Sequence, residues 1–428
     1  MHGGLVNGPA LDEEEVHRLD LEDPLSRFRS RFALPAGPSG RPLLYFCGHS
    51  LGPMPKEART LVNEEMDDWE ALGVEGHFRS RRPWYSYHER FRETGARLVG
   101  ARPGEVVMMN GLTVNLHLML ATFYRPTDER HAILIEEHAF PSDQYAVASQ
   151  IRHHGRDPDA SLLIARHRTG EPGLRTEDLE RLIQERGSSI AVVLLPGVQY
   201  LTGQALDLER LAAAAHRHGC VFGADLAHAA GNLPLRLHEW RVDFAVWCSY
   251  KYLNAGPGAV AGCFVHERHG LDRSLPRFAG WWGTDPATRF IMQPEFVPRP
   301  GADGWQIGNP PILALAPLLA SLQIFEEAGL EALRARSVRM TSYLLALLDR
   351  LPPGRVEVLT PRRPDERGCQ ISLRVRDGRA KPLLEALHRE GVVLDFREPD
   401  VLRLAPVPLY NTFHEIWRFA RVLEQTLA

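Results

Sequence analysis

The stretch DFAVWCSYKYLNAGPGAVAGCFVHE occupies residues 243–267. It places Lys251 between two apolar runs, residues 244–247 and residues 259–265. A lysine is almost never fully buried unless it is paired, and burial lowers its pKa towards the range in which the free amine is a nucleophile. On position alone, two interpretations of Lys251 stand. It reaches solvent from an edge strand, or it does chemistry at the end of a strand.

The composition is that of an ordinary soluble globular chain. The 428 residues are 44% hydrophobic and 24% charged, which predicts two or three domains and a large core. Lys and Arg number 50 and Asp and Glu number 54, so the net charge is −4. The sequence lacks the long basic stripe that binds a phosphate backbone, and a nucleic-acid partner is not expected.

The N-terminus and the cysteines indicate a cytoplasmic protein. Residues 1–20 are polar and acidic and lack the apolar core of a signal peptide, so we expect a loose arm to about residue 20. No run reaches 18 apolar residues, so no membrane span is expected. The odd number of cysteines predicts reduced and mostly buried thiols. They are Cys47, Cys220, Cys248, Cys263 and Cys369.

Short β-rich runs recur between residues 100 and 266, and several alternate with segments of helical period. The runs are EVVMMN (105–110), HAILIEE (131–137), SLLIAR (161–166), IAVVLLPG (190–197), CVFGADL (220–226), DFAVWCS (243–249) and AVAGCFVH (259–266). This alternation predicts an α/β fold with a mainly parallel, seven-stranded sheet. Such sheets bind ligands just beyond the carboxyl ends of their strands.

The pattern changes along the chain and predicts three regions. Residues 1–95 form an N-terminal arm and helical segment, residues 96–310 a large α/β domain, and residues 311–428 a small α+β domain. The small domain begins with a long helical pattern that has polar interruptions, and short strand-like and helix-like runs follow it. We expect the small domain to close over a substrate.

Four strand-like runs end in residues that suit one cofactor. They are followed by Leu112 and Thr113, by Phe140 and Asp143, by Asp225 and His228, and by Tyr250 and Lys251. Taken singly, Asp225 fits a helix cap and Phe140 fits a core position. Together they match the needs of pyridoxal phosphate, which are a lysine for the Schiff base, an acid for the ring nitrogen, a flat group against the ring and a phosphate cup at a helix start. The sequence therefore predicts a pyridoxal enzyme.

Two other motifs have simpler explanations. GPGAVAG (256–262) has glycines like those of a dinucleotide fingerprint, but its third glycine is one residue late and no βα turn precedes it. A tight turn after Lys251 explains these glycines. HRHGC (216–220) has residue types that bind metals, but after the Ala-rich LAAAA it is typical of a basic helix C-terminus. No metal site is predicted.

Eight motifs resemble, in order and approximate spacing, those of kynureninase, a fold-type-I pyridoxal-phosphate enzyme of tryptophan catabolism in the aspartate aminotransferase superfamily. They are FPSD (140–143), GVQYLTGQ (197–204), DLAHAAGN (225–232), CSYKYLNAGPG (248–258), GWWG (280–283), GNPPI (308–312), RGCQ (367–370) and RLAPVPLYNTFHE (403–415). The resemblance begins at YFCGHSLGPMP (45–55) and extends to the C-terminus, about nine tenths of the chain.

The resemblance implies hydrolysis of the Cβ–Cγ bond of L-kynurenine or 3-hydroxy-L-kynurenine to anthranilate or 3-hydroxyanthranilate and L-alanine. It also implies a homodimer with shared active sites. The implied catalytic residues are Lys251, Tyr250 and Asp225. The implied cofactor-binding residues are Leu112, Thr113, Phe140, Pro141, Ser142, Asp143, Asp225, His228, Tyr250, Lys251, Trp281 and Asn309, of which Trp281 and Asn309 complete the partner subunit's site. The implied substrate residues are His77, Asn309 and Arg403.

The residues themselves argue for an amino-acid substrate through Arg403. It lies in the apolar stretch LRLAPVP, where a lone guanidinium is costly unless it meets a carboxylate. That carboxylate belongs either to the substrate or to an internal acid. His77 and Asn309 resemble the pair found in family members that prefer the 3-hydroxylated substrate, and a preference for that substrate is predicted. The alternative is that His77 caps a loop.

Some positions depart from the family pattern, and other function classes stay open. Pro196, His49 and Thr284 stand where some members have a serine, an asparagine and a histidine, and Pro196 puts one polar contact to the cofactor in doubt. The second hypothesis is another fold-type-I enzyme, an aminotransferase or a cysteine desulfurase. A desulfurase needs a mobile, reactive cysteine, for which Cys369 is the one candidate, and we expect it to begin a strand. The third hypothesis is a non-enzymatic α/β binding protein.

Overall fold

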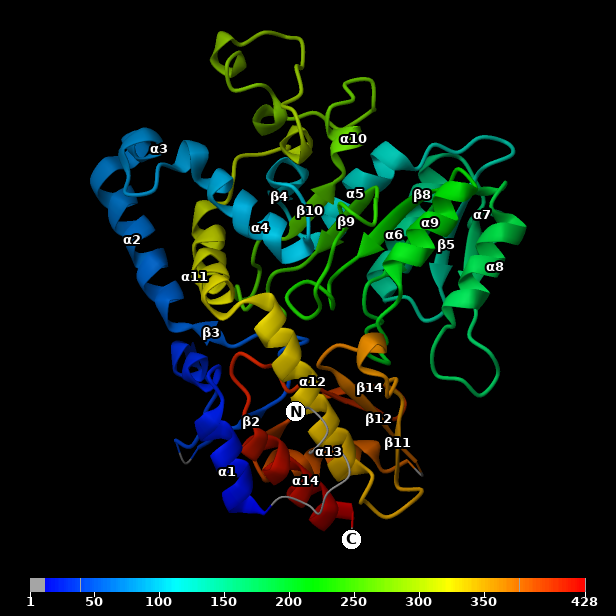
Figure 1. The fold of residues 1–428 in the computed structure, drawn as a ribbon. Coiled ribbons are helices and arrows are strands. Elements are labelled where there is room, and N and C mark those ends of the chain that lie inside the picture. Colours follow the sequence, from blue (N-terminus) through cyan, green and yellow to red (C-terminus); the bar gives the residue numbers. More distant parts are fainter. Residues whose placement is uncertain (1–11, 39, 377, 428) are drawn as a thin grey trace.

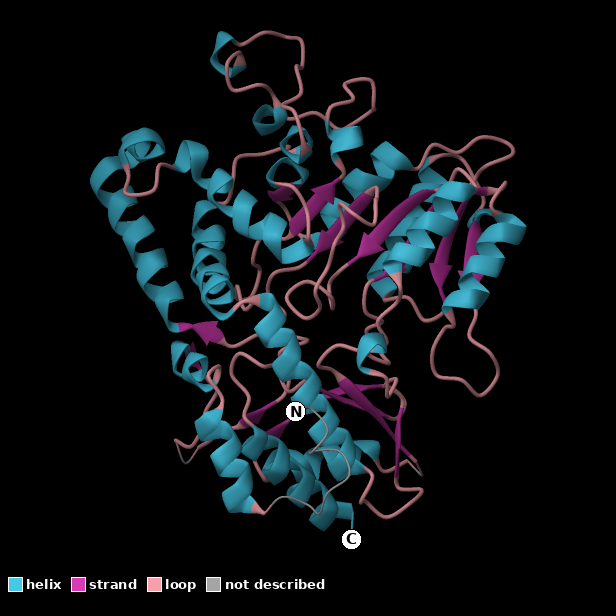
Figure 2. Cartoon of the chain, in the orientation of Figure 1, coloured by secondary structure: helices cyan, strands magenta, loops and turns pink. Residues whose placement is uncertain are grey.

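A computed structural model describes residues 12–38, 40–376 and 378–427. A seven-stranded sheet flanked by helices lies beside a smaller layered region that contains the C-terminal helix (Figure 1, Figure 2). The strand order in the large sheet is β4-β10-β9-β8-β7-β5-β6. The strands are β4 (Val106–Met108), β5 (Ala132–Glu136), β6 (Leu162–Ala165), β7 (Ile190–Pro196), β8 (Val221–Asp225), β9 (Phe244–Trp247) and β10 (Gly262–Val265).

The strands of this sheet run mainly in one direction. Every neighbouring pair from β9 through β8, β7 and β5 to β6 is parallel. Strand β10 is antiparallel to both of its neighbours, β4 and β9. The predicted seven-stranded, mainly parallel α/β sheet is therefore confirmed, and its seven strands lie in the seven predicted runs.

Both faces of the large sheet are buried, which explains why its strands read as continuous apolar runs rather than as alternating ones. Every residue of β7 is buried. Val193 and Leu195 pack into one core cluster, whereas Val192 and Leu194 pack into another. The helices that connect or precede the strands are α4 (Arg92–Val99), α5 (Leu112–Phe123), α6 (Pro141–His153), α7 (Pro158–Ser161), α8 (Thr176–Arg186), α9 (Leu208–Arg217) and α10 (Glu267–Gly270).

The C-terminal part forms a four-stranded antiparallel sheet in the order β11-β12-β15-β14. Its strands are β11 (Val356–Val358), β12 (Ile371–Val375), β14 (Asp395–Arg397) and β15 (Val401–Leu404), and its helices are α13 (Ala380–Arg389) and α14 (Phe413–Leu427). The long helical pattern before it is two helices, α11 (Ile312–Ala328) and α12 (Leu330–Leu348), which meet at 81°. Gly329 separates them with a φ of +77°, a conformation that strains residues with a Cβ.

The N-terminal region joins the two sheets. Strand β1 (Phe32–Ala33) pairs with β3 (Met54–Pro55), and β2 (Leu44–Tyr45) pairs with β13 (Val392–Val393) of the C-terminal part. Helices α2 (Lys56–Leu72) and α3 (Gly76–Arg79) follow. The domain boundaries at residues 95 and 310 stay a prediction.

The expectation of a loose arm up to residue 20 is wrong for residues 12–20, and residues 1–11 lie outside the described residues. Helix α1 (Glu13–Glu22) begins after Asp12, which forms a capping box with Glu15. Val16 on this helix is completely buried. Only Val16 and the partly buried Leu19 pack against the core, whereas Leu21 is exposed, so the composition of this acidic segment looks like that of an arm.

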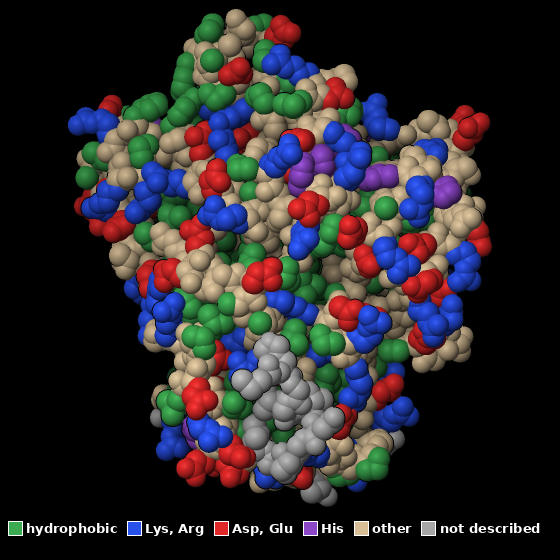
Figure 3. All heavy atoms as spheres, viewed as in Figure 1, with side chains coloured by type: hydrophobic (Ala, Val, Ile, Leu, Met, Phe, Trp, Pro, Cys, Tyr) green, Lys and Arg blue, Asp and Glu red, His purple; other side chains and the backbone are tan. Residues whose placement is uncertain are grey.

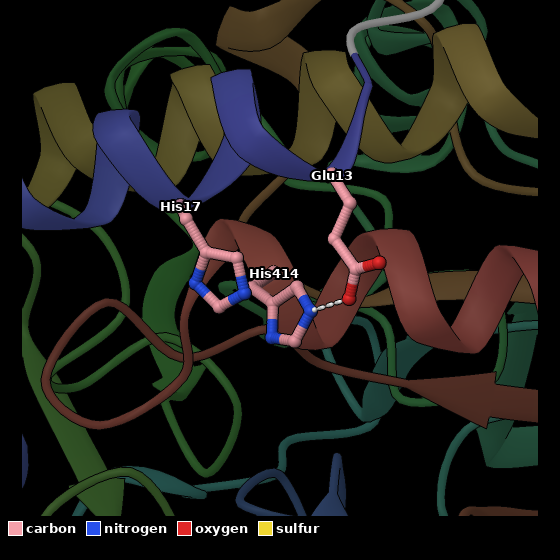
Figure 4. Close-up of side chains that lie close together, drawn as sticks. All are labelled: Glu13, His17 and His414. Carbon is pink, nitrogen blue, oxygen red and sulfur yellow. Dashed lines mark hydrogen bonds and ion pairs between the residues drawn. The ribbon is translucent and has the colours of Figure 1, made fainter.

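Helix α1 is held against α14, and its carboxylates supply what the start of α14 needs. Asp20 accepts hydrogen bonds from the backbone N–H groups of Phe413 (2.8 Å) and His414 (2.9 Å), which have no partner within their own helix. Glu13 Oε1 lies 2.9 Å from His414 Nε2, and the His414 ring lies 3.9 Å from the ring of His17 between centroids (Figure 4). The partner of α1 lies about 400 residues along the chain, so no local pattern predicts the contact.

The surface and the apolar helices agree with a chain of mixed charge. Positive and negative side chains are interspersed over the face shown in Figure 3. Within residues 12–38, 40–376 and 378–427, no single helix has the length and apolar character to cross a membrane, although the bent pair of α11 and α12 meets both criteria when taken together. All five cysteines are free and buried, as predicted.

Candidate active site

Lys251 lies in the loop that follows β9, at the carboxyl end of that strand. Since β9 pairs with β8 on one side and β10 on the other, it is not an edge strand, and the first interpretation of Lys251 is wrong. The loop is tightly bonded: Ser249 Oγ donates to the Val260 carbonyl (2.6 Å), and Asn254 N donates to the Lys251 carbonyl (3.0 Å). Residues 256 and 258 are glycines with positive φ, so GPGAVAG forms a turn, as predicted.

The Lys251 side chain opens into a cavity of about 180 Å³, which we call the Lys251 cavity. Its walls come from the carboxyl ends of β5, β7, β8 and β9 and from the starts of α5 and α6, where an α/β sheet of this kind binds its ligands. The lining residues are Leu112, Thr113, Glu136, Phe140, Ser142, Asp143, Pro196, Val198, Tyr200, Asp225, Ala227, His228, Tyr250 and Lys251. Nine of the twelve predicted cofactor-binding residues therefore line this one cavity. The other three are Pro141, Trp281 and Asn309.

His228 is the closest polar neighbour of the lysine amine. Lys251 Nζ lies 3.1 Å from His228 Nε2. The pKa of His228 is well below its ordinary value, because the ring is buried and because Lys251 and Arg403 place positive charge near it. A neutral imidazole accepts a hydrogen bond at Nε2 from the lysine amine.

Asp225 and Asp143 face the same cavity from β8 and α6. Asp225, 9% exposed, is oriented by a hydrogen bond that Oδ1 accepts from the backbone N–H of Ala227 (2.7 Å). The pKa of Asp143 is well above its ordinary value, because the group is buried and because the Asp225 carboxyl lies close enough to repel it and to share a hydrogen bond. Two acids predicted from separate strand ends therefore form one interacting pair.

The flat group and the phosphate cup also lie at the cavity. Phe140 is 38% exposed, and its ring centroid lies 5.9 Å from Lys251 Nζ. Helix α5 begins at Leu112 after Gly111, and no side chain caps this N-terminus, so its first N–H groups are available to an anion. Tyr250 stands beside the lysine, and burial raises the pKa of its hydroxyl, which keeps it protonated.

This set fits pyridoxal phosphate. The cavity is lined by an amine beside a neutral imidazole, by the start of a helix whose first N–H groups suit a phosphate, by an acid pair and by an aromatic ring. The fit rests on residue types that converge from four separate elements of the fold, β8, β9, α5 and α6.

Two lining residues carry chemistry that the sequence analysis missed. Glu136 ends β5 and is 5% exposed, and Tyr200 packs its ring edge-on against Phe140 with centroids 5.2 Å apart. A signal for Glu136 was present, because the apolar run HAILI ends in a glutamate where an open sheet binds its ligand. Tyr200 lies in a loop, where no periodicity indicates the direction of a side chain.

Arg403 does not line the cavity, and its guanidinium is paired with an internal acid. It is 1% exposed, Nε donates to Asp395 Oδ1 (3.0 Å), and one terminal nitrogen donates to the Tyr200 carbonyl (2.7 Å). Through Tyr200, whose ring lies 5.8 Å from the Arg403 guanidinium, it contacts the cavity wall. The internal-acid alternative therefore holds in this structure, and the substrate role of Arg403 stays a prediction.

Four predicted residues lie outside the cavity within this chain. Pro141 is exposed at the first turn of α6. Trp281 is 40% exposed, and Asn309 is exposed. His77 is half-buried on α3, with its ring edge against Trp84 at 5.6 Å. The cofactor and substrate roles of these residues stay predictions.

The three departures from the family pattern occupy different places. Pro196 lines the cavity at the end of β7, where it offers no N–H to a ligand. His49 is completely buried, with its ring 6.3 Å from that of His228, and its pKa is well below the ordinary value because of burial and the nearby Arg403 and Lys251 charges. Thr284 donates a hydrogen bond to the Val297 carbonyl (3.2 Å), away from the cavity.

Comparison with known proteins identifies the family. Residues 333–423 match the family model described as the kynureninase C-terminal domain. The chain is 56% identical over 403 residues to a kynureninase from Koribacter versatilis (strain Ellin345), a match that covers 94% of this chain and 95% of the relative. It is 55% identical over 412 residues to a kynureninase from Myxococcus xanthus (strain DK1622), covering 96% of each. The chain belongs to the kynureninase family.

Solved structures with the same fold agree with this membership. A C-DES mutant with glycine covalently linked to its pyridoxal-phosphate cofactor matches with a TM-score of 0.77 at 18% identity, over 92% of this chain and 99% of that chain. A cysteine desulfurase from Escherichia coli matches with a TM-score of 0.75 at 16% identity, over 94% and 98%. The predicted fold-type-I architecture, kynureninase family and pyridoxal-phosphate cofactor are confirmed.

Membership in the kynureninase family removes the two other function classes. The desulfurase hypothesis also lacks its nucleophile, because Cys369 is 1% exposed and burial raises the pKa of its thiol to about 12. Cys369 lies two residues before β12 and so precedes the strand that we expected it to begin.

The structure predicts that the loop around Gly52 holds the lysine loop in place. Gly52 N donates to the Tyr250 carbonyl (2.8 Å), and a Cβ at residue 52 would lie 2.2 Å from Asn254 Oδ1 and 2.4 Å from the Lys251 carbonyl oxygen. Gly52→Ala should therefore displace Lys251 and weaken cofactor binding by about tenfold or more in an absorbance titration. Gly104→Ala, whose Cβ meets nothing within 4 Å, is the control. Equal cofactor affinity in both variants would contradict this account.

Proposed function

We propose that this member of the kynureninase family hydrolyses the Cβ–Cγ bond of L-kynurenine or 3-hydroxy-L-kynurenine, releasing anthranilate or 3-hydroxyanthranilate and L-alanine. The observation that carries the proposal is the Lys251 amine, 3.1 Å from a neutral imidazole in a cavity lined by buried carboxyl groups. Relatives that are more than half identical over nearly the whole chain are named kynureninase. The reaction belongs to tryptophan catabolism and supplies precursors for NAD biosynthesis.

Each residue of the cavity has a task in this proposal. Bound pyridoxal phosphate supplies an electron sink for negative charge at the α-carbon of the amino acid. The Lys251 amine takes the proton from that carbon. The neutral His228, 3.1 Å from the amine, holds it in place. Asp225 would hold the ring nitrogen of the cofactor, and Phe140 would lie against its ring. Tyr250, whose hydroxyl is protonated in the free protein, would donate a hydrogen bond to the phosphate and take part in proton transfer to the substrate.

Arg403 binds the α-carboxylate of the substrate in this proposal. Its guanidinium is already bonded to Asp395 and to the Tyr200 carbonyl, so the substrate carboxylate shares a cation whose direction is fixed. The contact of Arg403 with Tyr200, a residue of the cavity wall, supports this assignment.

The central prediction concerns Lys251. Lys251→Ala should lose the visible absorbance of the bound cofactor, and turnover should fall by roughly a thousandfold or more, because the amine that holds the cofactor and moves the proton is gone. The measurement is release of the aromatic acid from each substrate, followed by fluorescence. Lys381→Ala is the control, since that lysine pairs at the surface with Glu398. No aromatic acid from either substrate with the wild-type protein would overturn the proposed function.

We place the protein in the cytoplasm as a homodimer with shared active sites. Free, buried cysteines suit a reducing compartment. The segment around η6 (Arg289–Ile291) projects from the body of the chain in Figure 1, and it exposes several large apolar side chains of the kind that mark protein interfaces. They are Phe278, Trp281, Phe290, Ile291 and Met292. In the dimer, Trp281 and Asn309 reach the partner subunit's cavity, which is consistent with their exposure within one chain.

Shared sites make a prediction about mixed variants. Lys251→Ala and Asn309→Asp chains should each be nearly inactive as homodimers, while a hybrid dimer has one site in which both residues are wild type. After dissociation and random reassembly, turnover should recover to about a quarter of the wild-type value. Sedimentation should show a dimer. A fully active monomer, or no recovery in the mixture despite hybrid formation, would contradict the shared site.

The choice of substrate is predicted to depend on His77 and Asn309. An imidazole and an amide can both hydrogen-bond a ring hydroxyl, and a site built for that hydroxyl leaves polar groups unpaired when it is absent. We predict a higher kcat/KM for 3-hydroxykynurenine than for kynurenine, with the ratio shrinking in His77→Phe. The alternative is that His77 has only a structural role, through its packing against Trp84. In that case the ratio of the two kcat/KM values does not change in His77→Phe. A preference for kynurenine that survives the substitution also counts against the prediction.

A further inference from the structure

Glu136 and Glu137 are neighbours in the chain with opposite surroundings. Glu136 is 5% exposed and lines the Lys251 cavity. The next residue, Glu137, lies beyond the end of β5 and pairs with Arg166 (3.0 Å) and His167 (3.3 Å), outside the cavity. A buried carboxylate is costly unless a cation or several N–H donors compensate it. Glu137 has the Arg166 cation beside it, whereas Glu136 faces a cavity lined by other acids.

The cavity holds more acids than it can ionise. Its titratable and charged lining groups are Glu136 on β5, Asp143 on α6, Asp225 on β8, and His228, Tyr250 and Lys251 in the loops after β8 and β9. His228 is neutral and Tyr250 is protonated. Lys251 is the one cation among these lining residues, against three carboxyl groups, and the negative charge of each buried carboxylate disfavours the ionisation of its neighbours. Some of the three acids must therefore keep a proton.

We propose that Glu136 is a positioning residue of the cofactor cavity, and that it stays a neutral carboxylic acid so that the Asp143–Asp225 pair presents a single negative charge. This inference rests on the proposed function for its consequence, since Asp225 is the acid that faces the cofactor ring. Three observations carry the inference: Glu136 is buried, it lies at the end of β5, and it shares the cavity with two other carboxyl groups, those of Asp143 and Asp225. Burial raises the pKa of Glu136 to about 8, a hydrogen bond from its own backbone opposes the rise, and the Asp225 charge adds to it.

The sign of the pH dependence follows from this protonation. The folded protein keeps the proton on Glu136 up to about pH 8, whereas the unfolded chain releases it near the ordinary value of 4.5. The unfolded state therefore binds fewer protons between these values, and Glu136 makes the folded protein less stable as the pH rises from about 4.5 to about 8. Glu136→Gln, which mimics the neutral acid, removes this loss.

The experiment measures thermal unfolding of the apo-protein from pH 5 to pH 9 for the wild type, Glu136→Gln and the matched control Glu137→Gln. The melting temperature of Glu136→Gln minus that of the wild type should increase by about 3 °C or more across this range. The increase for Glu137→Gln should be much smaller, since that residue lies outside the cavity, where solvent screens its pairs with Arg166 and His167. If the Glu136→Gln curve stays parallel to that of the wild type, the proposal is wrong.

A second measurement needs no variant to fold. Carbon-13 NMR of wild-type apo-protein labelled at the glutamate carboxyl should show one resonance that titrates near pH 8, apart from those that titrate near 4 to 5. Titration of every glutamate below pH 6 would overturn the proposal. In the holoenzyme, the alkaline limb of the kcat/KM profile near pH 8 should be absent from Glu136→Gln and present in Glu137→Gln. If a glutamate of the apo-protein titrates near pH 8 as expected but the holoenzyme turns over neither substrate, the proposed function is wrong and the assignment of a neutral Glu136 stands.

Discussion

The contact between Lys251 Nζ and His228 Nε2, 3.1 Å long, is the interaction on which the rest of the site depends. A lysine can stand at the end of a buried interior strand only if its surroundings tolerate an amine whose charge changes. The neutral imidazole provides this tolerance, because it bonds to the amine without adding charge of its own. The tight loop after β9 and the Gly52 segment then fix the direction of the side chain.

The acids around this lysine form the second constraint. Asp225, Asp143 and Glu136 reach one cavity from β8, α6 and β5, and parallel strands bring their carboxyl ends to the same edge of the sheet. Burial raises the pKa of both Asp143 and Glu136, which favours their protonated forms. Asp225 is oriented by the hydrogen bond that it accepts from the Ala227 N–H. The fold thereby sets the charge that a pyridoxal ring meets when it binds.

The sequence predicted what depends on local pattern and strand order, and it missed what depends on distant contacts. The seven strands and the residues at their ends follow from continuous apolar runs and from the ligand-binding edge of an open sheet. Helix α1 was missed because its stability comes from its contact with α14, where Asp20 accepts hydrogen bonds from the first backbone N–H groups of that helix. The pairing of Arg403 with Asp395 could not be predicted, since the residues around Arg403 in the sequence do not show whether its guanidinium meets an internal acid or the carboxylate of a substrate. His77, Trp281 and Asn309 lie outside the cavity of their own chain, and a single chain holds no information on what a second copy contributes.

The central claim is that the amine of Lys251, in this cavity, holds the cofactor. The chain contains three lysines, Lys56, Lys251 and Lys381, so the claim can be tested by direct chemical mapping. The holoenzyme is reduced with borohydride, which fixes the cofactor to the amine that carries it, and its peptides are then identified by mass spectrometry. The account predicts one pyridoxyl group per chain on the peptide that contains Lys251. A pyridoxyl group on Lys56 or Lys381, with the Lys251 peptide unmodified, would contradict it.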